Sequence, residues 1–245
     1  MTDRSRVPEI VTLYWIAKIA STTFGETAAD MASMTFDLGY IATTLIFFGI
    51  FAALLAAKLR VGGYHPALYW GVFTASAVAG TGLSDFLDRT AGLGYAGGAG
   101  VLVVALVAVL AVWRRVEGSL AVEGLTTARA EGLYWLAFLV ANTLGTAAGD
   151  YLADDLELGF AASAGAIGGV LVALALLQRL TQAPRLVLFW LAFVLTRPFG
   201  ATFGDLLTKG ADEGGLGVGT IGASALFLAI LVLAVRQEHR RHRAA

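Results

Sequence analysis

Eight apolar windows, each about the length of a membrane-crossing helix, follow one another along this chain of 245 residues. They run from Glu9 to Met31, Leu38 to Lys58, Pro66 to Phe86, Leu93 to Trp113, Gly132 to Leu152, Leu158 to Gln178, Leu186 to Leu206 and Leu216 to Val235. A helix needs roughly 20 apolar residues to cross the hydrocarbon core of a bilayer. Mean hydropathy is +0.75 and only 14% of the residues are charged, against about 25% in an ordinary soluble domain. The sequence therefore predicts an all-α integral membrane protein, a single membrane domain over 1–245 with eight transmembrane helices.

The basic residues indicate the orientation of these helices. Of the 17 Lys and Arg residues, 13 lie on one side: Arg4, Arg6, Lys58, Arg60, Arg114, Arg115, Arg129, Arg179, Arg185, Arg236, Arg240, Arg241 and Arg243. Arg89 and Lys209 lie on the other side, and Lys18 and Arg197 lie inside windows. Cytoplasmic loops retain Lys and Arg, so we expect both termini, including the short basic tail 236–245, to be cytoplasmic.

A short motif recurs four times in register. In each copy a Gly stands five residues before an Asp, and an aromatic-Trp pair places its Trp ten residues before that Gly. The glycines are Gly25, Gly80, Gly145 and Gly200, and the aspartates are Asp30, Asp85, Asp150 and Asp205. Leu-Gly-aromatic follows eight residues after the first three aspartates, whereas the fourth copy has Leu216-Gly217-Val218 three residues late. The windows therefore form four tandem two-helix repeats, at about 9–60, 64–115, 129–180 and 184–236.

This pattern resembles an uncharacterised bacterial membrane-protein family built from tandem two-helix repeats of unknown function. The resemblance covers almost the whole chain and implies an integral membrane protein, located in the bacterial inner membrane, without implying a substrate. Each repeat holds an even number of spans, so all four copies enter the membrane the same way round. We expect parallel repeats, with pseudo-symmetry about an axis along the membrane normal.

Polar residues share one face of the odd-numbered windows. Side chains four residues apart are neighbours on a helix, and stepping back by fours from each Asp gives one lane per repeat. The lanes hold Glu26, Thr22 and Lys18; Thr81, Ala77 and Phe73; Thr146, Asn142 and Phe138; and Ala201, Arg197 and Phe193. The even-numbered windows are almost wholly apolar, so we expect the odd helices to line an interior and the even helices to face lipid.

Charged groups inside a bilayer are costly, by about 2.5–3.5 kcal/mol at a helix centre, so these lanes need pairing, water or a bound ion. The four aspartates and Glu26 suggest a cation site near the non-cytoplasmic end, with Lys18 and Arg197 as deeper counter-charges or gating groups. Carboxylate and Thr oxygens suit a divalent cation, the one cofactor that we consider, or protons. The main hypothesis is thus a small transporter or channel for cations.

A structural interpretation of the same residues stays open. The aspartates would then be helix caps or solvated interfacial residues, Lys18 would pair with Glu26 or Arg197 with a neighbouring Asp, and the glycines would allow close helix packing. The Trp pairs would form an interfacial aromatic belt. The protein would be a non-transporting membrane scaffold or sensor.

Enzymatic activity is not expected. An intramembrane aspartic protease would carry Gly-x-Gly-Asp, but Ala147 and Thr202 stand at the first Gly position before Asp150 and Asp205. The chain has no Cys, which excludes disulfides, thiolate metal sites and cysteine nucleophiles. With a net charge of −1, nothing indicates nucleic acid. The expected partners are the lipid bilayer and, in a homo-oligomer, further copies of the chain.

Overall fold

A computed structural model describes residues 6–61, 63–122 and 125–244; of the residues interpreted above, Arg4 and the last residue of the tail lie outside these ranges. Within the described residues the chain forms eight α-helices and no strand: α1 (Thr12–Asp30), α2 (Gly39–Val61), α3 (Pro66–Asp85), α4 (Gly94–Glu117), α5 (Ala128–Asp150), α6 (Gly159–Leu180), α7 (Arg185–Thr208) and α8 (Thr220–Ala244). The predicted all-α architecture is confirmed.

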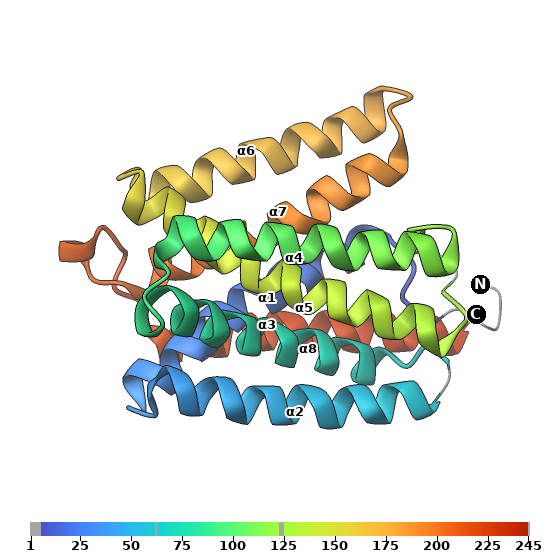
Figure 1. Cartoon of the computed structure of the whole chain (residues 1–245), viewed down its shortest axis with the longest axis horizontal. Coiled ribbons are helices and arrows are strands. Elements are labelled where there is room, and N and C mark those ends of the chain that lie inside the picture. Colours follow the sequence, from blue (N-terminus) through green and yellow to red (C-terminus); the bar gives the residue numbers. More distant parts are fainter. Residues whose placement is uncertain (1–5, 62, 123–124, 245) are drawn as a thin grey trace.

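The odd-numbered helices form a closed inner ring. α1 packs against α3 and α7, and α5 packs against the same two helices from the other side. The four even-numbered helices lie outside this ring, and only 11% to 28% of their most apolar stretches is buried, against 44% for α7. Figure 1 shows the helices running along one common direction, with both termini at the same end. Below, the end at which α1, α3 and α5 finish is called the aspartate end, and the other end is called the basic end.

Each outer helix packs mainly on the inner helix of the following repeat. α2 lies against α3, α4 against α5 and α6 against α7, and α8 closes the circle against α1. The two helices of one sequence repeat are therefore not the pair of helices that pack together most extensively. Every repeat packs one side of its apolar outer helix on a neighbouring repeat, and the last repeat packs on the first.

Five of the described helices are long and apolar enough to cross a membrane: α2, α4, α6, α7 and α8. α1, α3 and α5 are not among them. These three inner helices carry many of the buried polar side chains, which lowers their hydropathy, and at 19, 20 and 23 residues they still have the length of a membrane-crossing helix. Several membrane-like helices are thus present, as the sequence predicted.

A single turn of π-helix links inner to outer helix in the first three repeats, at Met31–Thr35, Phe86–Thr90 and Tyr151–Asp155. The Gly of the Leu-Gly-aromatic motif follows with φ of 71°, 65° and 73°. Left-handed backbone of this kind favours Gly. The motif therefore marks the point at which the chain reverses into the outer helix.

The fourth repeat, whose Leu-Gly pair comes three residues late, departs from this geometry. α7 runs on to Thr208, and a single 3-10 turn at Ala211–Glu213 replaces the π-turn. The longer loop projects from the aspartate end in Figure 1. It brings Lys209 beside the aspartates of two repeats.

Candidate functional site

The lanes of the four inner helices meet as five layers. From the aspartate end inward these are the aspartate layer (Asp30, Asp85, Asp150, Asp205), the glutamate layer (Glu26, Thr81, Thr146, Ala201), the arginine layer (Thr22, Ala77, Asn142, Arg197), the lysine layer (Lys18, Phe73, Phe138, Phe193) and the tyrosine layer (Tyr14, Tyr69, Tyr134, Phe189). All of these side chains are buried except Phe189, which is half-buried. Contacts within the layers join residues from different repeats.

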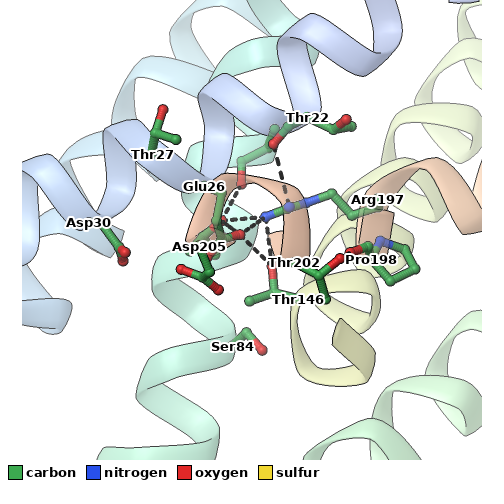
Figure 2. A network of polar contacts seen from close by, with 12 residues as sticks. Thr22, Glu26, Thr27, Asp30, Ser84, Thr146, Arg197, Pro198, Thr202 and Asp205 are labelled. Atoms are coloured by element: carbon green, nitrogen blue, oxygen red, sulfur yellow. Dashed lines mark hydrogen bonds and ion pairs between the residues drawn. The ribbon is translucent and has the colours of Figure 1, made fainter. Parts of the chain in front are cut away.

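Arg197 is the centre of the polar network. Its side chain leaves α7 and reaches the glutamate layer, where Nη2 lies 3.0 Å from the Glu26 Oε2 of α1. The same nitrogen donates to the Thr146 hydroxyl at 2.6 Å and to the Thr81 hydroxyl. Thr81 and Thr146 in turn donate to Glu26 at 3.2 and 3.5 Å. One guanidinium therefore contacts the equivalent position of all three other polar lanes, as Figure 2 shows for Glu26 and Thr146.

Lys18 has a different environment. Its Nζ lies 3.6, 4.9 and 5.1 Å from the ring centroids of Phe193, Phe73 and Phe138, which occupy the equivalent positions of the other three repeats. Among the described residues, no carboxylate lies within ion-pair distance of Lys18; Glu26 pairs with Arg197 instead. The Lys18–Glu26 salt bridge considered from the sequence is therefore wrong.

The aspartate layer is paired only in part. Lys209 Nζ lies 2.8 Å from Asp30 and 3.5 Å from Asp205, and Arg89 lies 3.3 Å from Asp85. Lys209 lies beyond the end of α7, and although burial opposes its charged form, Asp205 and Asp30 raise its pKa above the ordinary value. Within the described residues, Asp150 has no ion-pair partner.

The capping and solvated interpretations of these aspartates are wrong for the first three. Asp30, Asp85 and Asp150 make no side-chain cap hydrogen bond. They are only 3% to 5% exposed. In the described part of the chain, no three Asp, Glu or His side chains lie close enough together to hold one metal ion. The layer is thus a set of buried carboxylates next to two basic side chains.

The aligned glycines lie where the inner helices approach one another closely. A Cβ built on Gly25 would stand 2.6 Å from the Cβ of Ala77, and one on Gly80 would stand 3.1 Å from that of Asn142. Gly145 faces the stem of Arg197, and Gly200 faces Thr22 at 2.7 Å. Each Gly therefore meets the arginine-layer residue of the next repeat. This cyclic pattern gives the inner ring its pseudo-fourfold arrangement.

The remaining lane residues extend the polar network. Asn142 donates to the Ser76 hydroxyl at 3.0 Å, and Thr22 donates to the Thr196 carbonyl at 3.2 Å. The Nη1 of Arg197 lies 3.5 Å from the Thr22 carbonyl. Arg197 Nε is buried and has no partner in the described part of the chain.

Sequence reasoning missed the aromatic half of the site. The rings around Lys18 stand twelve residues before each Asp, on the lane already traced, and four residues further back Tyr69 and Tyr134 share a hydrogen bond of 2.5 Å. The expected interfacial belt is wrong for Trp70 and Trp135, which are 2% and 0% exposed. The signal was present in the sequence, because the positions equivalent to Lys18 in the other three repeats are all Phe.

A separate apolar groove of about 380 Å³ lies outside the inner ring. α2, α3 and α8 contribute most of its walls, with Arg236 at one end. None of the lane residues lines it.

Comparison with known proteins agrees with the repeat architecture. The family described as Repeat of Unknown Function (DUF347) matches residues 13–64, 68–119, 133–183 and 188–244. No curated protein matches the chain, and no solved structure matches it. Each of the four matched segments spans one inner helix and the outer helix that follows it. The chain therefore belongs to the DUF347 repeat family, with four tandem copies of the repeat.

Proposed function

We propose that this protein is a transporter or channel in which all eight helices cross the membrane and a cation moves along the axis of the inner ring. The observation that carries this proposal is the burial of the charged lane residues where four helices meet, with Arg197 in contact with three other repeats. Buried charges in a bilayer are costly and are typical of ion pathways and proton relays.

The distribution of charge gives the path a direction. Buried carboxylates stand at the aspartate end and attract positive charge, whereas Arg197 and Lys18 lie deeper and oppose it. The basic residues gathered at the opposite end favour a cytoplasmic location for that end and for both termini. The aspartates then face the outside of the bacterial inner membrane, where a cation would enter.

The Arg197–Glu26 pair serves as the gate in this proposal. Glu26 accepts hydrogen bonds from a guanidinium and two Thr hydroxyls, so an arriving cation or proton competes with Arg197 for the same carboxylate. Because no three acidic side chains converge among the described residues, the arrangement favours a proton or a monovalent cation over a divalent metal held by several carboxylates.

Flux through reconstituted liposomes tests this proposal. Asp30→Asn, Asp85→Asn, Asp150→Asn and Asp205→Asn, made singly, should each reduce proton or cation flux, since each removes a buried negative charge from the entry. Asp212→Asn is the matched control because Asp212 is an exposed Asp in the loop at the same end. Unchanged flux in all four lane variants would sink the proposal.

A non-transporting scaffold or sensor is the second candidate, and the filled axis favours it. Arg197 and Lys18 occupy the centre of the ring, and glycine contacts hold the inner helices close together. In that case the same variants lower thermal stability, and the wild-type protein conducts no more than empty liposomes.

A further inference from the structure

In the lysine layer, a buried lysine side chain is surrounded by aromatic rings. At this depth the second, third and fourth repeats place Phe73, Phe138 and Phe193, and the first repeat places the side-chain nitrogen of Lys18 among their rings. The rings also pack on one another, with centroids 4.2 Å apart for Phe73 and Phe138 and 5.0 Å apart for Phe138 and Phe193. Lys18 is 1% exposed.

Packing alone does not account for a lysine here. A fourth apolar residue would complete the layer without desolvating a charge, and replacing buried charges by apolar residues of similar volume is often neutral or stabilising. Within the described residues, Lys18 has no carboxylate partner that would repay the cost. The other buried lysine, Lys58, contacts Glu131 at 2.6 Å.

The chemistry of the rings selects a class of cation. Aromatic faces attract cations electrostatically and form the cages that recognise alkylammonium groups. They offer no oxygen ligands, which Mg²⁺ and Ca²⁺ require. A cation that sheds its water easily and spreads its charge over C–H or N–H bonds fits three Phe rings, whereas a strongly hydrated metal ion does not.

We propose that the lysine layer is a binding site for ammonium or a short alkylammonium, filled at rest by the tethered ammonium of Lys18. This inference rests on the proposed function, because it names the substrate class of the same path. The cation that has passed Glu26 reaches the three rings by displacing Lys18 from them. Lys18 is thus an internal occupant of the substrate site.

Binding to the full-length Lys18→Ala variant in detergent tests the inference without any flux measurement. Removing the side chain empties the cage while Phe73, Phe138 and Phe193 stay in place. Trimethylammonium should bind this variant at least about tenfold more tightly than tert-butanol, its neutral near-isostere. It should not bind Lys18→Leu, in which an apolar side chain refills the cage.

A second substitution identifies the rings as the ligand. Phe193→Leu, added to Lys18→Ala, removes the ring that stands closest to the ammonium and should weaken trimethylammonium binding about tenfold while leaving tert-butanol unaffected. Absence of trimethylammonium binding to Lys18→Ala, or equal affinity for the two probes, would overturn the inference.

Folding of the variant provides a second readout. If Lys18→Ala alone is not monodisperse, purification in the presence of trimethylammonium should yield monodisperse protein, and purification in the presence of tert-butanol should not. If neither probe rescues the variant, or if both rescue it equally, the inference is rejected. If Lys18→Ala binds trimethylammonium but the wild-type protein shows no flux, the binding site stands and the proposed transport function is rejected. If the wild-type protein carries protons but Lys18→Ala does not bind trimethylammonium, the transport function stands and the binding site is rejected.

Discussion

Arg197 and Glu26 are separated by 171 residues in the chain, and their charged atoms lie 3.0 Å apart. The pair joins α7 to α1, the contact through which the inner ring closes. Both side chains are buried. The charge of each is therefore compensated by a residue far away in the sequence, so the pair forms only when the first and fourth repeats have come together.

Breaking this pair should destabilise the protein strongly. Arg197→Met leaves Glu26 as an uncompensated buried charge, and Glu26→Met does the same to Arg197, each at a cost of about 3–5 kcal/mol. The double variant should lose much less than the sum of the two. Unfolding of the detergent-solubilised protein measures all three, with Arg115→Met, at an exposed position, as the control. Additive losses would show that the two side chains are not coupled.

The aligned glycines should tolerate no Cβ. Gly25→Ala is expected to lower thermal stability, because the new methyl group would overlap Ala77, and Ala77→Gly in the same chain should restore part of the loss. Gly49→Ala is the matched control, since nothing lies within 4 Å of its Cβ and helical Gly→Ala changes stabilise by about 0.4–1 kcal/mol where no strain arises. Equal effects at the two glycines would contradict the close approach of α1 and α3.

The two halves of the chain should stay together after cleavage. α4 packs on α5 and α8 packs on α1, so both outer contacts between the halves survive a cut between α4 and α5. Backbone and side-chain bonds from Arg6 to Leu125 and Thr126 add a third link. A protease site inserted after Ser119 and cleaved in the folded protein should leave one complex on a non-denaturing gel. Separation into two fragments would contradict the circular packing.

Asp88 should make stability depend on pH. It lies in the π-turn between α3 and α4 with its Oδ1 buried and unpartnered among the described residues, and burial raises its pKa to about 6, although Ser84 donates to its Oδ2 at 3.1 Å. The unfolded chain releases this proton near pH 4. Protonated Asp88 therefore stabilises the folded state fully below about pH 4, and this stabilisation is lost as the pH rises through about 6.

Asp88→Asn should then raise the melting temperature at pH 7.5 and have little effect below pH 4. Asp212→Asn is the control, because Asp212 is an exposed Asp in the 3-10 turn at the same end of the molecule. An Asp88→Asn effect that does not change with pH would show that the carboxyl does not titrate in this window.

The repeat and its spacing predicted much of this structure. Eight helices, the short connections after Asp30, Asp85 and Asp150, and the close packing expected as one role for Gly25 and its equivalents all follow from local sequence. The reason is physical: helix length, a left-handed Gly at each reversal and a step of four residues on a helix face are properties of short segments.

The site is different because its contacts join residues far apart in the chain. The lane from Asp30 to Lys18 could be traced on one helix, but nothing local to Lys18 says that three Phe rings from other repeats surround it. The sequence suggested Glu26 as the partner of Lys18 and a neighbouring Asp as the partner of Arg197, and only the crossing of α7 with α1 placed Arg197 beside Glu26.

The sequence by itself determined the helices, their tandem repetition and the positions of charge along each one, because these depend on hydropathy and on periodicity within a segment. The tertiary structure alone decided that each outer helix packs on the inner helix of the next repeat. It also decided which charge is paired and which lies among rings. These outcomes depend on how closely four glycine-bearing helices approach one another, and that distance is set by the facing side chains rather than by any one repeat.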